Sequence, residues 1–129
     1  MTAAWHAMAQ LASWPDLMEA PPSCGTGRAL RSTRAELAHF HSDRSADVHL
    51  TAGAIHRFER QLRDSTAIHL IPGSHWVTVR MECEVDISLL MTLTSAALQA
   101  HGRWPAGLAA LPVRCNDRRE TVLAHRVCL

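Results

Sequence analysis

The stretch AELAHFHSDRSADVHL, residues 35–50, decides the fold because polar and apolar residues alternate on both sides of a polar turn. Strand geometry places successive side chains on opposite faces, so each half predicts a half-buried strand. We expect residues 42–46 to form the loop of an antiparallel hairpin, in which His41 faces Asp47 and His39 faces His49. One face then carries Ala38, Phe40, Val48 and Leu50, which suit a core, and the other carries His39, His41, Asp47 and His49.

The other expected elements surround this hairpin. In chain order they are a helix from Thr2 to before Pro15, a strand at 28–32, a helix at 52–64 capped by Thr51, strands at 67–71 and 75–81, and a helix at 86–101. In the strand at 75–81, Trp76, Thr78 and Arg80 share one face. This order predicts an α+β fold with two layers, a mainly antiparallel sheet and helices packed on one face.

Length and composition limit the classes of function. A chain of 129 residues with 47% hydrophobic and 19% charged residues fits a single globular domain. The net charge of +1 gives no reason to expect a nucleic-acid partner. The N-terminus has no basic segment typical of a signal peptide and no apolar run is long enough for a membrane span, so we expect a cytoplasmic protein. Arginine supplies every basic residue and alanine is abundant, which indicates a GC-rich, actinobacterial type of genome.

The cysteines and the C-terminal region carry weaker signals. Cys24, Cys83, Cys115 and Cys128 form no CxxC pair, so the sequence spells out no zinc knuckle and reduced, structural thiols are expected. We expect residues 1–102 to form the core and residues 103–129 to form an extension, either a final hairpin or an arm.

Four segments resemble a small family of bacterial and fungal domains known as the luciferase domain family. They are SWPDL near the start, ELAHFHSDRSADVHL, PGSHWVTVRM and the helix EVDISLLMTLTSAAL, and the resemblance runs from Trp14 to about residue 100. The family name implies no particular chemistry, so the resemblance supports the fold and the central motif. Carried over by position, the family pattern includes Glu36, His39, His41, Asp43, Asp47 and Trp76, whereas His49 departs from it.

The histidine face can support acid–base catalysis. Directly opposed residues on an antiparallel pair have Cβ atoms about 4.5–5.5 Å apart, so these side chains can converge. An imidazole can exchange a proton at physiological pH, and an adjacent carboxylate fixes its tautomer. We therefore predict His41 as the proton carrier, Asp47 as its orienting partner and His39 as a second donor. The predicted substrate contacts are Trp76, Arg80, His49, Trp104 and Asp43.

Two other interpretations of the same face remain open. His39, His41 and His49, with Asp47 or water, offer nitrogen and oxygen ligands that zinc or iron accepts, although an HxH pattern alone is a weak signal. Alternatively the side chains only cover the solvent side of a hairpin, with Asp43 in an Asx-type turn.

The favoured prediction is a small enzyme without a cofactor that cyclises, isomerises or hydrolyses a small organic molecule, in specialised metabolism. One alternative is a binding or interaction module without catalysis, forming a homodimer through an exposed strand edge. The other is a metal-dependent oxygenase or hydrolase. The sequence contains no phosphate loop and no nucleophile elbow, so nucleotide chemistry and a serine hydrolase have no support.

Overall fold

The structure, a computed structural model, describes residues 2–102 and 115–116. Its sheet has six strands in the order β1-β2-β3-β4-β6-β5, and every pair of neighbours is antiparallel. The strands are β1 (Met18–Ala20), β2 (Arg28–Arg31), β3 (Glu36–Phe40), β4 (Ser45–His49), β5 (Ile68–Leu70) and β6 (Trp76–Arg80). The strands β3, β4 and β6 therefore lie inside the sheet, where each is hydrogen-bonded to a neighbour on both sides.

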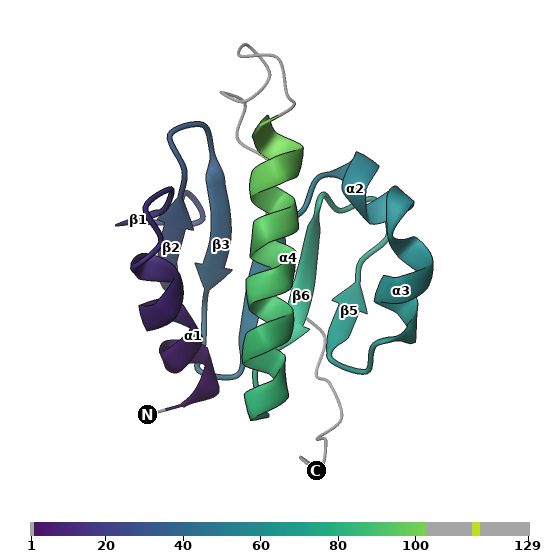
Figure 1. The fold of residues 1–129 in the computed structure, drawn as a ribbon, viewed down its shortest axis with the longest axis horizontal. Coiled ribbons are helices and arrows are strands. Elements are labelled where there is room, and N and C mark those ends of the chain that lie inside the picture. Colours follow the sequence, from purple (N-terminus) through teal and green to yellow (C-terminus); the bar gives the residue numbers. More distant parts are fainter. Residues whose placement is uncertain (1, 103–114, 117–129) are drawn as a thin grey trace.

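The helices cover one face of this sheet (Figure 1). They are α1 (Ala3–Ala12), α2 (Ala52–Arg57), α3 (Glu59–Asp64) and α4 (Glu84–Gly102). The long helix α4 crosses the middle of the sheet and contacts β3, β4 and β6, while α1 packs beside it. This arrangement confirms the predicted α+β fold with a mainly antiparallel sheet and helices on one face.

The hydrophobic core lies between the helices and the sheet. Core side chains from the strands include Leu30, Ala38, Phe40, Val48, Val77 and Val79, all completely buried. Leu90 and Ala97 of α4 pack onto them, which explains why this helix lies on the centre of the sheet. The predicted separation of the two hairpin faces is therefore confirmed, because its apolar residues belong to this core.

The predicted register of the central hairpin is wrong by two residues. In the structure Ala38 pairs with Val48 and His39 pairs with Asp47, so the turn is shorter than the expected loop at 42–46. Because side chains alternate with a period of two, a slip of two residues leaves every side chain on its predicted face. The polar face consequently keeps its members and changes only their pairing.

One helix and one edge strand also differ from the sequence prediction. The helix expected at 52–64 is divided into α2 and α3 at Phe58, whose φ of −106° and ψ of 14° leave helical geometry. The short edge strand β1 was not among the elements expected from the sequence. Apart from Cys115 and Asn116, the extension at 103–129, including its predicted hairpin and Trp104, lies outside the described residues.

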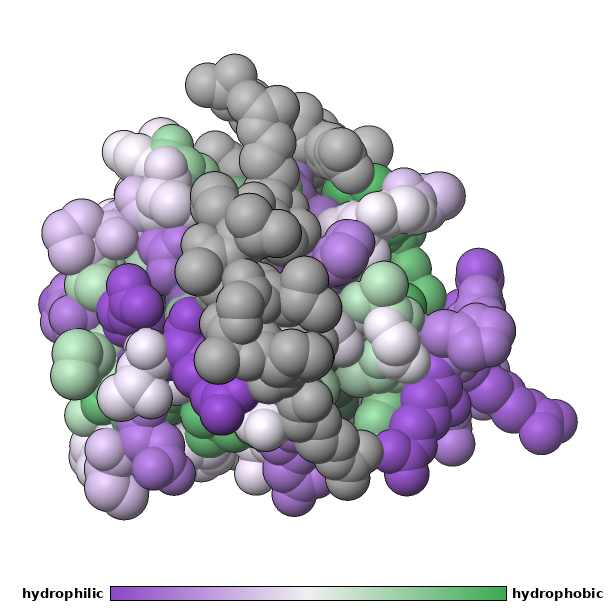
Figure 2. All heavy atoms as spheres, turned by 90° about the horizontal axis from the view of Figure 1, so that it is seen from above, coloured by the Kyte–Doolittle hydropathy of each residue, from purple (hydrophilic) through white to green (hydrophobic). Residues whose placement is uncertain are grey.

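Seen from above, hydrophilic and hydrophobic side chains are interspersed on the surface (Figure 2). In the part of the chain that the structure describes, the exposed large hydrophobic residues are Met18 on β1 and Val85 in the first turn of α4. Single apolar residues at a surface are ordinary and do not indicate an interaction site. Among the helices at residues 2–102, none has both the length and the apolar character needed to cross a lipid bilayer.

Candidate metal centre

The face of the sheet opposite the helices carries polar side chains that are buried. His39 on β3, Asp47 on β4 and Thr78 on β6 pair across the three central strands, and their exposed fractions are 1%, 4% and 3%. The sequence had suggested that His39 and Asp47 act on a substrate held on this face. Because these side chains are buried, their polar groups must form hydrogen bonds with one another or bind a ligand.

A loop before β2 brings Cys24 over this face. Gly27, at the end of the loop, has a φ of +79°, a conformation that L side chains rarely adopt. A Cβ at this position would collide with the carbonyl oxygen of Phe40 and would lie 2.9 Å from the Cα of His41. The absence of a side chain therefore allows the loop backbone to lie against the end of β3, next to His39 and His41.

Cys24, His39, His41 and Cys115 form one compact group of metal-binding side chains, here called the Cys–His cluster. One ligand atom from each residue lies within 4.8 Å of all the others. Cys24 Sγ is 3.2 Å from His41 Nε2 and 3.7 Å from His39 Nδ1, and Cys115 Sγ is 3.6 Å from His41 Nε2. Because Cys24 and Cys115 are not in a disulfide, both sulfurs can act as ligands, and the cluster could hold a metal ion.

A carboxylate lies behind each histidine of the cluster. Glu36 Oε1 is 3.4 Å from His39 Nε2, and Asp47 Oδ2 is 3.7 Å from His41 Nδ1. In each ring the nitrogen near the carboxylate is the one that does not face the Cys–His cluster. Metal-binding histidines commonly use their second ring nitrogen in this way, because the carboxylate fixes the tautomer and makes the ligand more basic.

Hydrogen bonds fix Cys115 beside this face through its neighbour Asn116. The backbone N–H of Asn116 donates to Asp47 Oδ2 at 3.0 Å, and its side-chain amide donates to the Trp76 carbonyl and to Thr78 Oγ1, each at 3.1 Å. The hydroxyl of Ser74 donates to the side-chain oxygen Oδ1 of Asn116. Asn116 is 1% exposed, so this segment covers the sheet and holds Cys115 near His41.

His49 lies on the same face but outside the Cys–His cluster. Its ring stacks on Trp76 with centroids 4.7 Å apart, and His101 of α4 contacts it edge-on at 4.4 Å. His101 Nε2 donates to the carbonyl oxygen of His49 at 2.9 Å. Burial, reinforced by the nearby His101, lowers the pKa of His49 to about 3, and burial also lowers the pKa of His101. Both rings are therefore neutral at physiological pH.

The structure brings together some of the predicted site residues and separates others. His39, His41 and Asp47 converge, whereas the alternative metal set that included His49 is replaced by one that includes two cysteines. Trp76 is 1% exposed and its ring lies between those of His39 and His49, so it is not the exposed substrate contact that was predicted.

Two other predicted substrate contacts are more exposed. Arg80 is half-buried at the end of β6. Asp43 is exposed in the hairpin turn, where Ser42 Oγ accepts a hydrogen bond from the Arg44 backbone.

Sequence reasoning missed the contribution of the cysteines. Cys24 and Cys115 lie in no spacing motif, and their convergence depends on the Gly27 loop and on Asn116. One signal of a metal site was present in the sequence, because the HxH motif at His39 and His41 occurs together with cysteines that had no assigned role. Cys83 also differs from the expected reduced state, because it takes part in a disulfide.

Comparison with known proteins adds one positive finding. Residues 34–97 match the model of a family described as Luciferase domain, which confirms the resemblance expected from the sequence. The matched region contains Glu36, His39, His41 and Asp47, whereas Cys24 and Cys115 lie outside it. No curated protein and no solved structure matched the chain.

Proposed function

We propose that the protein, whose residues 34–97 match the Luciferase domain family, is a zinc-binding protein in which one ion joins the sheet to the segment Cys115–Asn116. The description of the family names no metal, so the proposal depends on the site itself. The observation that carries it is the convergence of two thiols and two imidazoles within 4.8 Å.

The distances suit a tetrahedral ion. Zinc–nitrogen and zinc–sulfur bonds of about 2.0–2.3 Å place the ligands of a regular tetrahedron about 3.3–3.8 Å apart. The contacts of 3.2, 3.6 and 3.7 Å in the Cys–His cluster lie close to this range. The other ligand pairs lie within 4.8 Å, so binding would draw these side chains together by up to about 1 Å.

The ligand types favour zinc over iron. Two sulfur and two nitrogen ligands in a tetrahedral arrangement are typical of zinc, and thiolates disfavour hard cations such as magnesium and calcium. Two thiolates and two neutral imidazoles balance the charge of a divalent ion. Glu36 and Asp47 would orient His39 and His41, which supports the assignment of these two residues as ligands.

A site with four protein ligands is a structural centre. Catalytic zinc sites usually keep one position open for water or substrate, whereas structural sites are closed by four side chains. Cys115 would supply the closing ligand here. We therefore infer that the ion stabilises the covered sheet face and does not activate a substrate.

The test is the metal content of untagged protein purified without chelators, measured by elemental analysis. About one zinc per chain is expected, with loss of zinc in Cys115→Ser and in His41→Ala. His56→Ala is the matched control, because His56 is exposed on α2, and it should retain the metal. A folded wild-type protein without zinc, or retention of zinc by both ligand variants, would contradict the proposal. Iron in place of zinc would contradict the choice of ion.

A second candidate function is the acid–base enzyme acting on a small organic molecule. The 3.7 Å separation of His41 Nδ1 and Asp47 Oδ2 favours it. In such an enzyme His41→Ala and Asp47→Ala should each lower the rate roughly 10²-fold or more, measured on a substrate found by small-molecule screening. If both variants kept full turnover, the pair would have no catalytic role. A metal-free, folded wild-type protein would favour this candidate over the zinc centre.

A further inference from the structure

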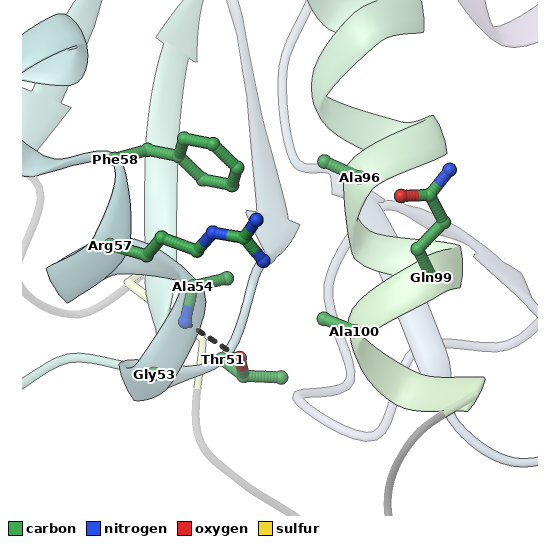
Figure 3. A pocket seen from close by; sticks show the side chains of 8 residues that line it. All are labelled: Thr51, Gly53, Ala54, Arg57, Phe58, Ala96, Gln99 and Ala100. Carbon is green, nitrogen blue, oxygen red and sulfur yellow. Dashed lines mark hydrogen bonds between the residues drawn. The ribbon is translucent and has the colours of Figure 1, made fainter.

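A pocket of about 390 Å³ lies between α2 and α4, on the helix side of the sheet (Figure 3). Its walls combine apolar side chains, from Ala54, Phe58, Ala96 and Ala100, with polar ones, from Thr51, Arg57 and Gln99. Pockets of this size, with apolar walls and a few polar groups, are typical of sites for small molecules. We propose that this pocket binds a small organic molecule with one carboxylate and a flat apolar body.

Arg57 carries the argument for a carboxylate. In Figure 3 its side chain extends from α2 toward α4, across the space between the two helices. Its guanidinium lies 5.3 Å from the centre of the Phe58 ring, and a guanidinium stacked on a ring leaves its N–H groups available at its edge. Within the described residues no acidic side chain pairs with it, whereas Arg63 on α3 is paired with Glu59 at 2.8 Å. A planar fork of this kind matches a carboxylate bidentately.

The opposite wall determines the shape of the ligand. Ala96 and Ala100 are one turn apart on α4, and Figure 3 shows their methyl groups pointing toward α2. Larger side chains at these positions would fill the space that the pocket occupies. The Phe58 ring and the two alanines therefore leave room for a thin apolar group such as an aromatic ring.

The pocket and the Cys–His cluster lie on opposite sides of the sheet. Ala54 and Phe58 pack on the core between helices and sheet, whereas His39 and His41 lie on the other face or at its end. The pocket is thus a second site beyond the proposed zinc centre. Its ligand can be tested whether or not zinc is bound.

The test is a titration of the full-length ¹⁵N-labelled protein with benzoate, followed by NMR, with benzamide as the neutral probe of the same shape. Benzoate should shift the resonances of residues 51–58 and 96–100 in a saturable way and should bind at least about 10-fold more tightly than benzamide. Arg57→Gln should weaken benzoate binding about 10-fold or more. Arg63→Gln, the matched control on the neighbouring helix, should leave it within about 2-fold.

A second variant tests the cavity. Ala100→Leu places a larger side chain in the pocket and should abolish the benzoate shifts, with the spectrum confirming that the protein is folded. Equal binding of benzoate and benzamide, or unchanged benzoate affinity in Arg57→Gln, would overturn the assignment of a carboxylate. Saturable binding that persists in a folded Ala100→Leu protein, or the absence of any saturable shift in the pocket, would overturn the site itself.

Discussion

At the scale of single residues, Asp47 connects three parts of the molecule. Its carboxylate accepts hydrogen bonds from Thr78 Oγ1 on β6 at 2.7 Å and from the backbone of Asn116 at 3.0 Å, and it lies 3.7 Å from His41 Nδ1. A buried carboxylate needs such partners, because an uncompensated charge away from water is costly. Asp47 therefore orients the histidine and holds Cys115 in place through Asn116.

Gly27 is the residue on which the position of Cys24 depends most directly. We expect Gly27→Ala to lower stability by more than about 1 kcal/mol, because it adds a backbone collision to the strain of a positive φ. Gly25→Ala is the matched control, since Gly25 has a similar φ of +82° but an added Cβ would meet nothing within 4 Å. Chemical denaturation measures both variants, and zinc content should fall in Gly27→Ala alone. Equal losses of stability in the two variants would show that the close approach has no role.

At the scale of elements, the central hairpin shows what a polarity pattern can determine. Alternation in residues 35–50 correctly assigned Phe40 and Val48 to the core and His39 and Asp47 to the polar face. The register escaped prediction because pairings that differ by two residues bury the same side chains. A shift of two residues changes the length of the turn and the diagonal side-chain contacts, and neither can be predicted from the alternation of polar and apolar residues.

The candidate site was only partly predictable for a related reason. His39 and Asp47 lie on adjacent strands and His41 directly follows β3, so local periodicity was enough to bring these three residues together. Cys24 and Cys115 converge through a glycine contact and an asparagine hydrogen-bond network, and neither leaves a regular spacing in the sequence. The sequence also did not predict the division of the helix at Phe58, because the apolar stripe of the expected helix at 52–64 continues across the break.

The start of α4 is another feature of an element with a testable role. Asp86 Oδ2 accepts hydrogen bonds from the backbone N–H groups of Cys83 at 2.9 Å and Glu82 at 3.1 Å, before the first turn of the helix. Asp86→Ala should lower the free energy of unfolding by about 1–3 kcal/mol, since it leaves these donors without their acceptor. The exposed Glu84 in the same turn is the control, and Glu84→Ala should cost less than about 1 kcal/mol. Comparable effects on the melting temperature would argue against a specific cap.

At the scale of the whole molecule, both faces of the sheet are covered over its central strands. The helices bury one face, and the other is covered by the Cys24 loop and the segment Cys115–Asn116. Among the described residues, this second covering reaches the sheet through Cys24, Cys115 and Asn116. A metal ion held by Cys24, Cys115 and the two histidines would therefore join the covering to the sheet and add to its stability.

Zinc removal should consequently destabilise the whole protein. If free zinc is held 100-fold above its dissociation constant, binding contributes about 2.7 kcal/mol, so a chelator should lower the melting temperature by about 10 °C. Adding zinc back should restore it. Cys115→Ser should melt at the same temperature with and without chelator, which separates metal binding from direct effects of the chelator. A wild-type melting temperature insensitive to chelator would contradict a structural role.

Acidification should also destabilise the fold through His49. In the unfolded chain this histidine takes up a proton near its usual pKa of about 6.5, whereas burial and His101 lower the folded pKa to about 3. The unfolded state thus binds more protons between these values, and stability falls by up to about 1.4 kcal/mol per pH unit as the pH decreases below about 6.5. His75 and His39 act in the same direction as His101, and a hydrogen bond with the Glu36 backbone opposes them.

Denaturation between pH 7 and pH 4 measures this dependence. His49→Phe keeps an aromatic ring against Trp76 but has no titrating group, so its stability should decrease less steeply than that of the wild type. Identical slopes would exclude His49 as the source.

The distance along the chain between the proposed ligands has a consequence for the order in which the centre assembles. Cys24 is 15 and 17 residues from His39 and His41, whereas Cys115 is 74 residues from His41. Closing a short loop loses less chain entropy than closing a long one, so a three-ligand centre should form first and Cys115 should bind last. Release should then follow the reverse path, with the ion first exposed to competing chelators on the side that Cys115 leaves.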